Sequence, residues 1–254
     1  MNVQNSGKRR ILVTGGASGI GAAVVKFFDD IGEVVCSVDI NFHSMPNTRV
    51  MRLQGDVCCE EDVTRVTRQA IDGMGGIDVL VNCAGIADTI TATVGQDTED
   101  WRKIIEVNLT GTYLMCKEAG THMVGRGSGN IVNIASVAGM SGFPRRNGYS
   151  SSKAAIINLT RSLACEWGPS GVRVNCVAPG YVRTPLVSQL EDDGKIDVQR
   201  INGRTPLGRM GVPMEIAHAV AYLSSDWSSY VAGATIPVDG GWTAFGGSGE
   251  IATF

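Results

Sequence analysis

The sequence predicts one α/β domain, in which a doubly wound parallel sheet carries helices on both faces. Short, uninterrupted apolar runs recur along the chain, and such runs are typical of strands in a parallel sheet that is buried on both sides. Helix-length segments alternate with these runs, which favours β-α-β connections. A glycine-rich turn lies between the first apolar run and the first helical segment. Because no linker and no repeat interrupts this pattern, we expect residues 1–254 to form a single domain.

The expected elements follow one another along the chain. Strands are predicted at Ile11–Val13, Val34–Val38, Val50–Leu53, Val79–Val81, Ile131–Ala135 and Val172–Ala178. Helices are predicted at Ala22–Ile31, Glu60–Met74, Thr98–Met123, Tyr149–Trp167 and Pro213–Ser224. The segment at about 181–212 contains many charged and few large apolar residues. We therefore expect an irregular, mobile flap over a site there, with a plain surface loop as the alternative.

Composition excludes several classes of protein. The net charge is −3 and no cluster of basic residues alternates with aromatic ones, so we expect no nucleic-acid partner. No apolar run reaches the length of about 18 residues that a membrane span needs, and the basic residues near the start precede only three apolar residues. We expect a soluble cytoplasmic protein without a membrane partner. The seven cysteines and three histidines show no metal-ligand spacing, so we expect no metal site.

The glycine turn has the spacing Gly15-x-x-x-Gly19-x-Gly21, with Ser18 and Ile20 inside it. This spacing differs from the G-x-G-x-x-G dinucleotide fingerprint. The physical argument for phosphate binding still applies, because glycines let the backbone approach a pyrophosphate and the following helix presents its N–H groups to it. The alternative is a tight strand-to-helix turn without a ligand.

Polar residues and turns follow the next strands. Asp39 ends the second strand, where a carboxylate can accept hydrogen bonds from the adenosine ribose and would repel a 2′-phosphate. This position favours NAD over NADP. Asp56 with Val57, and the run from Asn82 to Gly85, would lie on the same carboxyl edge of the sheet and contact the cofactor. Both segments could also be simple turns.

Tyr149 and Lys153 stand four positions apart at the start of a predicted helix. They would lie on one face of that helix, with Cβ atoms about 5–6 Å apart. A phenol is a poor base at neutral pH, but a neighbouring ammonium favours its ionised form. Tyr149 is therefore a candidate general acid/base. Taken alone, the same spacing also fits an exposed helix start.

The motifs together resemble those of the short-chain dehydrogenase/reductase family, across nearly the whole chain. The matching residues, in chain order, are Thr14-Gly15-x-x-x-Gly19-x-Gly21, Asn82-x-Ala84-Gly85, Asn108, Ser136, Tyr149-x-x-x-Lys153 and Pro179-Gly180. Each motif is weak alone, but their joint occurrence at this spacing is specific. The resemblance implies a Rossmann-like fold, a nicotinamide cofactor and hydride transfer.

The resemblance also implies roles for single residues. Tyr149 would exchange a proton with the substrate oxygen, and Ser136 would hydrogen-bond the same oxygen. Lys153 would hold the nicotinamide ribose, and Asn108 would anchor a water molecule that links Lys153 to solvent. Cofactor contacts, from the turns and from the resemblance, are expected at Gly15, Ser18, Gly19, Ile20, Gly21, Asp39, Asp56, Val57, Asn82, Ala84, Gly85, Tyr149, Lys153, Pro179, Gly180, Val182 and Thr184.

The predicted activity is hydride transfer between NAD and a secondary alcohol or ketone, with a polyol, sugar or similar small alcohol as substrate. A 3-ketoacyl-type or other carbonyl reductase is the first alternative, although in this family it usually takes NADPH, against which Asp39 argues. A dinucleotide-sensing protein without turnover is the second, but the catalytic set is complete. Substrate-facing positions are expected at Ala87, Asp88, Val137, Ala138, Phe143, Arg145, Arg146, Tyr181 and the flap. The pair Arg145-Arg146 raises the hypothesis of an anionic substrate.

Assembly is expected to be a homotetramer. The predicted helices Thr98–Met123 and Tyr149–Trp167 carry apolar residues on more than one face, which suggests that one sheet does not cover them all. The resembled family commonly forms tetramers through the corresponding helices. The glycine-rich tail at about 239–254 also contains aromatic residues suited to an interface.

Overall fold

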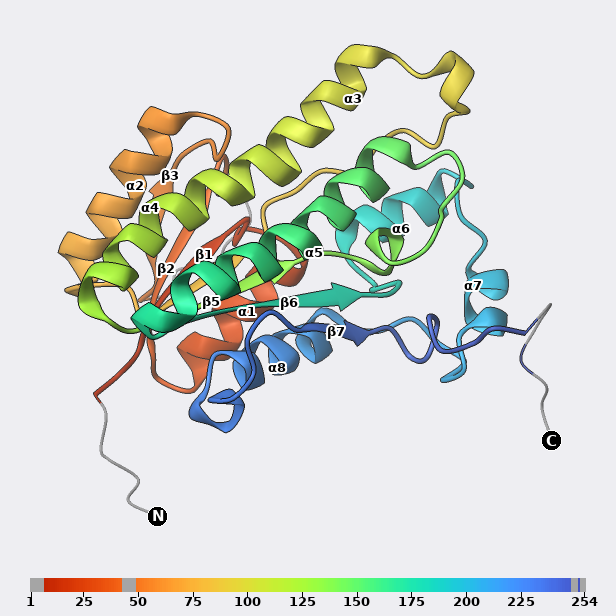
Figure 1. Ribbon diagram of the computed structural model, residues 1–254. Coiled ribbons are helices and arrows are strands. Elements are labelled where there is room, and N and C mark those ends of the chain that lie inside the picture. Colours follow the sequence, from red (N-terminus) through yellow and green to blue (C-terminus); the bar gives the residue numbers. More distant parts are fainter. Residues whose placement is uncertain (1–6, 43–48, 248–250, 252–254) are drawn as a thin grey trace.

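The computed structural model describes residues 7–42, 49–247 and 251. Within these ranges the chain forms a seven-stranded sheet with the order β3-β2-β1-β4-β5-β6-β7. Every neighbouring pair of strands is parallel. Helices cover both faces (Figure 1). The predicted doubly wound α/β fold is confirmed.

The strands agree closely with the predicted apolar runs, with one addition. They are β1 (Arg10–Thr14), β2 (Val34–Asp39), β3 (Met51–Gln54), β4 (Val79–Asn82), β5 (Gly129–Ile134), β6 (Val172–Pro179) and β7 (Thr235–Val238). Sequence analysis did not predict β7. This strand is short, contains Pro237 and is only partly buried, as suits an edge strand with one hydrogen-bonded neighbour.

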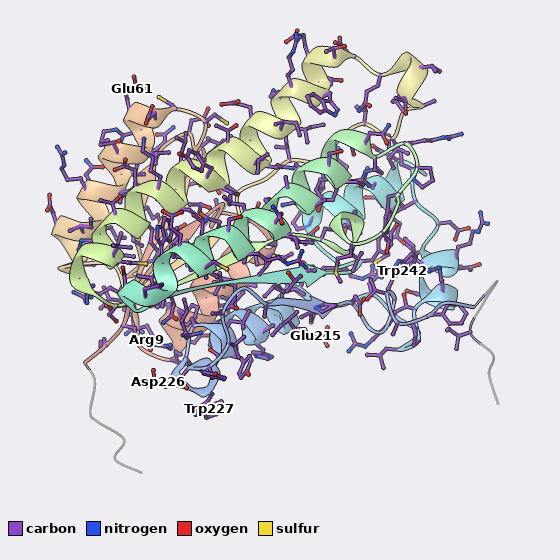
Figure 2. The ribbon with its side chains drawn as sticks, viewed as in Figure 1. Arg9, Glu61, Glu215, Asp226, Trp227 and Trp242 are labelled. Atoms are coloured by element: carbon purple, nitrogen blue, oxygen red, sulfur yellow. The ribbon has the colours of Figure 1, made fainter. Side chains whose placement is uncertain are left out.

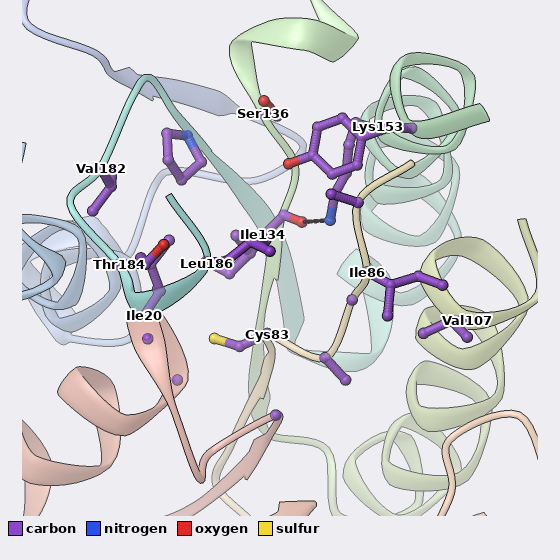
Figure 3. Close-up of a pocket in the computed structure, with 18 of the residues that line it drawn as sticks. Ile20, Cys83, Ile86, Val107, Ile134, Ser136, Lys153, Val182, Thr184 and Leu186 are labelled. Carbon is purple, nitrogen blue, oxygen red and sulfur yellow. Dashed lines mark hydrogen bonds between the residues drawn. The ribbon is translucent and has the colours of Figure 1, made fainter. Parts of the chain in front are cut away.

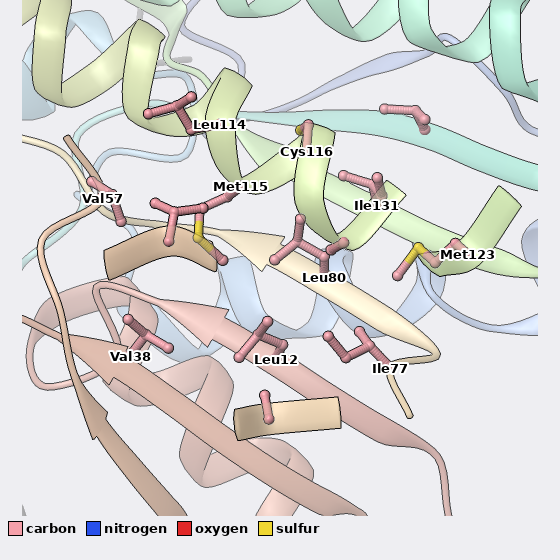
Figure 4. Packing of buried hydrophobic residues seen from close by; sticks show 14 of the residues in the cluster. Leu12, Val38, Val57, Ile77, Leu80, Leu114, Met115, Cys116, Met123 and Ile131 are labelled. Atoms are coloured by element: carbon pink, nitrogen blue, oxygen red, sulfur yellow. The ribbon is translucent and has the colours of Figure 1, made fainter. Parts of the chain in front are cut away.

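The helices divide into two layers. On one face, α1 (Gly19–Asp30) and α8 (Pro213–Leu223) pack on the sheet and bury residues such as Phe28 and Ile216. On the other face, α2 (Glu60–Met74), α4 (Gly111–Arg126) and α5 (Asn147–Trp167) do the same. Figure 4 shows Met115 of α4 against Leu80 and Leu12 of the central strands. The sheet is thus buried on both sides, which is why its strands read as continuous apolar runs.

The helix predicted at Thr98–Met123 is not regular throughout. It consists of α3 (Thr98–Ile105), a π-helical segment, η2 (Glu106–Thr110), and α4. The fully buried Asn108 lies in the π-helical segment. Its Oδ1 accepts a hydrogen bond from the Ile86 N–H at 2.8 Å, and its Nδ2 donates to the Ile86 carbonyl at 3.0 Å. The irregular turn therefore fastens the loop after β4, a role typical of π-bulges near functional sites.

The segment predicted as an irregular flap contains two helices, α6 (Pro185–Asp192) and α7 (Val198–Arg204). Its two ends are hydrogen-bonded to each other, because Arg183 N donates to the Gly211 carbonyl and Gly211 N donates to the Tyr181 carbonyl, each at 2.9 Å. The prediction of an irregular segment is wrong, since short helices with few apolar residues give a weak periodic signal. Whether the segment moves over the site stays a prediction.

The apolar residues that suggested a subunit interface are mostly buried within this one chain. Ile104, Met115 and Ile156 all lie in the core, with relative exposures of 3%, 0% and 1%. Tyr113 is an exception at 47%. The sheet indeed does not cover all of these residues, but α5 also packs against α3 and α4, so their apolar character is explained without a second subunit. The remaining 3-10 segments are η1 (Thr93–Gly95), η3 (Val137–Gly139), η4 (Gly168–Ser170) and η5 (Asp226–Ser228).

The predicted tail is described up to residue 247 and at residue 251, and the rest of it lies outside the described residues. None of the helices in the described part of the chain is long and apolar enough to cross a membrane.

Candidate active site

A cavity of about 660 Å³ opens at the carboxyl ends of the central strands. Strand order reverses at β1, whose neighbours are β2 on one side and β4 on the other. Loops that leave the sheet there diverge to opposite faces, which leaves a crevice where open α/β sheets bind ligands. The cavity is lined by the glycine turn, by the loops after β2, β3, β4, β5 and β6, and by the start of α5. The fold alone therefore selects this edge as the site.

The glycine turn fits a dinucleotide phosphate because it leaves no room for side chains. Gly15 has a φ of 65°, and a Cβ there would lie 2.7 Å from the Cα of Ala84. A Cβ on Gly21 would lie 2.1 Å from the carbonyl oxygen of Gly15. The turn therefore presents bare backbone and the N-terminus of α1 to the cavity. Backbone N–H groups in this arrangement stabilise a phosphate, so the residues present fit the implied cofactor.

Asp39 stands beside this turn at the end of β2. Its Oδ2 accepts a hydrogen bond from Ala17 N at 3.0 Å, and the residue lines the cavity. The carboxylate keeps further lone pairs for a ligand's hydroxyl groups. Asp56 and Val57 line the same end of the cavity from the loop after β3.

At the other end, Ser136, Tyr149 and Lys153 line the cavity together. Lys153 is buried, and its ammonium donates to the Ile134 carbonyl at 2.9 Å, which Figure 3 shows as a dashed line. Its Nζ lies 5.6 Å from the centre of the Tyr149 ring. The loop with Ser136 lies tightly on α5, since a Cβ on Gly139 would lie 2.6 Å from the backbone carbon of Lys153. This close contact places the loop that carries Ser136 against the helix that carries Tyr149 and Lys153.

The first turn of α5 is held by a buried carboxylate. Asp88 Oδ1 accepts a hydrogen bond from Arg146 Nε at 2.6 Å, and its Oδ2 accepts one from Tyr149 N at 3.1 Å. The Asp88 side chain has no exposed surface. Arg146 is thus already paired, which weakens the hypothesis that it binds an anionic substrate. Arg145 is exposed and absent from the cavity lining among the described residues.

The flap forms the wall of the cavity that faces Ile86 and Val107. Figure 3 shows Val182, Thr184 and Leu186 on one side of the space and Ile86 and Val107 on the other. Thr184 begins α6, where its Oγ1 accepts a hydrogen bond from a backbone N–H. Its methyl group lies 3.6 Å from the Cβ position of Gly19, so the flap starts directly over the glycine turn.

Three aromatic side chains contact one another at one side of the cavity. Tyr181 and Phe143 line it, and both contact the Trp242 ring, with ring centres 5.1 Å and 6.4 Å away. The Arg204 guanidinium lies 4.1 Å from the centre of the Trp242 ring, and its Nη1 donates to the Trp242 carbonyl at 3.1 Å. Figure 2 shows Trp242 beyond the end of β7, beside α7. Burial raises the pKa of Tyr181 although both Arg146 and Arg204 act against it, so Tyr181 is a neutral phenol.

The chain is similar in sequence to several known proteins. A family model described as enoyl-(acyl carrier protein) reductase matches residues 15–243. An uncharacterized short-chain type dehydrogenase/reductase of Sinorhizobium fredii is 43% identical over 245 residues, which cover 92% of this chain and 43% of that longer protein. The cis-4-hydroxycyclohexanecarboxylate dehydrogenase of Sinomonas cyclohexanicum is 41% identical over 245 residues, which cover 93% of this chain and 97% of that protein.

The chain belongs to the short-chain dehydrogenase/reductase family. The solved structure of ElxO with NADP bound is 32% identical, with a TM-score of 0.88 over 94% of this chain and 100% of that one. The family places the chain among the oxidoreductases. Together with the glycine turn, this similarity supports a nicotinamide dinucleotide as the cofactor.

Most of the predicted site residues of this short-chain dehydrogenase/reductase line the one cavity. They are Gly15, Ser18, Gly19, Ile20, Gly21, Asp39, Asp56, Val57, Ala84, Gly85, Ser136, Tyr149, Lys153, Pro179, Gly180, Val182 and Thr184. The expected substrate positions Ala87, Val137, Ala138, Phe143, Arg146 and Tyr181 also line it. Their placement is the one that the predicted roles require, and the roles themselves stay predictions.

Three predicted residues are held away from the cavity. Asn82 is buried in the sheet, where its Nδ2 donates to Asn133 Oδ1 at 2.9 Å and contacts the Cys116 sulfur. The side chain thus links β4 to β5, and the predicted contact of Asn82 with the cofactor stays a prediction. Asp88 was expected to face the substrate, but its carboxylate is used by Arg146 and the backbone of α5. Asn108 holds the Ile86 backbone with both its Oδ1 and its Nδ2. Its predicted role in anchoring a water molecule stays a prediction.

Sequence analysis expected the flap to face the substrate but did not single out the residues of the flap that do so. Leu186, Val187 and Leu190 of α6 and Ile196 beyond it give the flap an apolar inner surface. A signal was present, because Thr184 followed by a proline is a typical helix N-cap and first position. Cys83 also lines the cavity, and burial raises the pKa of its thiol to about 12 against the weaker effect of Lys153, so it stays a neutral packing residue.

Proposed function

We propose that the chain is an NAD-dependent dehydrogenase that converts a small secondary alcohol to a ketone, and that also catalyses the reverse reaction. The observation that carries this proposal is that Ser136, Tyr149 and Lys153 line the same cavity as the glycine turn. Polyols, sugars and ring alcohols are the proposed substrates. The relative named as a hydroxycyclohexanecarboxylate dehydrogenase supports a ring alcohol in particular.

The chemistry follows from the side chains at that end. Ser136 and Tyr149 would both hydrogen-bond the substrate oxygen, which fixes the alcohol and stabilises charge on that oxygen. Tyr149 would take the hydroxyl proton, and the Lys153 ammonium would stabilise the phenolate that can do so. When bound, NAD supplies the acceptor for the hydride. Lys153 would also hold a ribose hydroxyl, and a water molecule near Asn108 would pass the proton from Lys153 to solvent.

The preference for NAD rests on Asp39. Its carboxylate lies at the mouth of the glycine turn, where it can accept hydrogen bonds from ribose hydroxyls and would repel a 2′-phosphate. The basic residues that line the cavity within the described part of the chain are Lys103, Arg146 and Lys153, and the last two belong to the substrate end. A 3-ketoacyl-type reductase that takes NADPH is therefore the less favoured function.

The test is an NADH absorbance assay with the purified protein over a panel of secondary alcohols and polyols, with NAD and NADP in parallel. Tyr149→Phe is expected to lower kcat by about 10²- to 10⁴-fold while leaving NADH binding unchanged, because the ring stays and only the acid/base group is lost. Tyr113→Phe is the matched control, since that exposed tyrosine on α4 should not affect turnover. Turnover retained by Tyr149→Phe would show that the proposed chemistry is wrong.

We also propose that the enzyme is a homotetramer, as its family resemblance implies. Trp227 and Tyr230, which follow α8, have relative exposures of 87% and 103% and offer aromatic surface for such contacts. Gel filtration with light scattering at micromolar concentration tests this, and a mass of one chain would contradict it.

A further inference from the structure

Aromatic rings stand beyond the carboxyl ends of three neighbouring strands, β5, β6 and β7. Phe143 lies in the loop between β5 and α5, Tyr181 follows β6, and Trp242 follows β7. We call these three residues the aromatic wall. The residues predicted to bind adenosine, Asp39 and Asp56, follow β2 and β3 on the other half of the sheet. The aromatic wall therefore belongs to the substrate end of the cavity.

Trp242 connects the other two rings. The centre of the Phe143 ring lies 6.4 Å from that of Trp242, with 28° between the ring planes. The centre of the Tyr181 ring lies 5.1 Å from that of Trp242, with 60° between the planes. Phe143 and Tyr181 line the cavity, and Trp242 supports both of them. Aromatic pairs at such distances attract one another beyond the area that they bury.

The chain around Trp242 holds its ring in place. The Arg204 guanidinium lies 4.1 Å from the ring centre, and its Nη1 donates to the Trp242 carbonyl at 3.1 Å. The turn before Trp242 lies directly on the chain after α7, since a Cβ on Gly241 would lie 2.8 Å from Pro206. Within this turn, Asp239 Oδ1 accepts a hydrogen bond from Gly241 N at 2.9 Å. The wall is thus built before a substrate binds, which reduces the ordering cost of binding.

The substrate end offers few polar side chains to a ligand. No Asn, Gln, Glu or His side chain lines the cavity within the described ranges. Arg146 lines it but only donates hydrogen bonds, and its Nε is already bound to Asp88. Of the two wall residues that line the cavity, Tyr181 carries one hydroxyl and Phe143 no polar group. A substrate hydroxyl placed there would lose its hydrogen bonds to water without a carboxylate or amide to accept it.

We infer that the aromatic wall selects a secondary alcohol with an apolar carbon body over a polyol or a sugar. This inference rests on the proposed function and narrows its substrates to one class. Phe143 and Tyr181 contact the carbon body of the substrate, and Trp242 is a positioning residue that acts through them. The apolar inner surface of the flap has the same character, at Leu186, Val187, Leu190 and Ile196.

Cyclohexanol and myo-inositol test the inference, because they share one carbon ring and inositol carries a hydroxyl group on every carbon atom. With NAD, we expect kcat/KM for cyclohexanol to exceed that for myo-inositol by at least about 100-fold, the rejection that an apolar pocket achieves against an added hydroxyl. Phe143→Asn places an amide on the wall and should narrow this ratio by at least about 10-fold. A wild type that uses myo-inositol equally well, or a ratio that Phe143→Asn leaves unchanged, would overturn the inference.

The role of Trp242 is tested by the division of its effect between KM and kcat. Trp242→Leu should raise KM for cyclohexanol by about 3- to 10-fold and leave kcat nearly unchanged, because aromatic contacts that support the wall are lost. The affinity for NADH should stay unchanged, since the glycine turn and Asp39 follow β1 and β2. Trp242→Phe keeps an aromatic ring and should restore most of the KM.

Phe245→Leu is the matched control. The Phe245 ring centre also lies near Arg204, at 5.9 Å from its Cζ, but Phe245 does not line the cavity in the described part of the chain. This variant should keep the KM of the wild type. Equal effects of Trp242→Leu and Phe245→Leu, or a loss of NADH affinity in Trp242→Leu, would show that Trp242 only supports the fold.

Binding without turnover separates this inference from the proposed function. Calorimetric titration of the protein with NADH bound uses the same two alcohols, and no reaction takes place because the cofactor is already reduced. We expect cyclohexanol to bind more tightly than myo-inositol by at least about 10-fold. Equal binding of the two, or no binding of cyclohexanol, would overturn the inference. Binding of cyclohexanol without turnover of any alcohol would contradict the proposed function alone.

Discussion

The glycine turn offers the sharpest test of how this site is built. A methyl group added at Gly21 would lie 2.1 Å from the carbonyl oxygen and 2.7 Å from the carbonyl carbon of Gly15. Both are backbone atoms, so no side-chain rotation can relieve the overlap. Either α1 or the turn has to move, and each is fixed by the sheet on one side, since Gly15 N donates to the Val38 carbonyl at 2.8 Å.

The expected cost of Gly21→Ala is about 3 kcal/mol, the upper part of the range for overpacking in a well-packed interior. For a chain of this size, that cost corresponds to a decrease in Tm of about 6–12 °C. Movement of the turn also displaces the N–H groups that would bind the phosphates, so we expect NADH to bind at least about 10-fold more weakly. Differential scanning calorimetry and NADH fluorescence titration measure the two effects.

Gly125→Ala is the matched control. Gly125 also lies in a helix, α4, but a Cβ there would meet no atom within 4 Å. Alanine is the better helix former by about 0.5–1 kcal/mol, so this variant should be slightly more stable and bind NADH normally. A Gly21→Ala protein with the stability and affinity of Gly125→Ala would refute the close-contact explanation.

Two further predictions follow from carboxylates. Asp39→Ser should raise kcat/KM for NADP relative to NAD by at least about 10-fold, because it removes a charge that repels the 2′-phosphate; an unchanged ratio would count against the role of Asp39. Burial acts to raise the pKa of Asp78, but hydrogen bonds from Arg10 and Arg126 outweigh it and hold the pKa at about 2, below the ordinary value of 3.8 for this group. This carboxylate therefore stabilises the fold above about pH 4, and the contribution is lost as the pH falls towards 2. Asp78→Asn should cost about 2 kcal/mol in urea unfolding at pH 7 and about half of that at pH 3, and an equal loss at both pH values would contradict the assignment.

Much of the fold and of the cofactor end could be predicted because the signals are local. The apolar runs around Leu12 and Leu80 identify strands wherever they pair, since a strand buried on both faces needs apolar residues on both. The glycine turn and Asp39 each follow directly from a strand end, and the carboxyl ends of parallel strands meet at one edge. Tyr149 and Lys153 share a helical face by spacing alone.

The sequence by itself thus determined most of the strands, the edge of the sheet that carries the site and the candidate catalytic pair, because each depends on residues that are neighbours in the chain. Only the tertiary structure decided that Asp88 meets Arg146 across 58 positions, and that Asn82 turns into the sheet instead of the cavity. It also decided that α5 packs against both α3 and α4. The sequence shows that a helix face is apolar or that a residue is charged. Which residue each one contacts depends on how loops from separate strands converge.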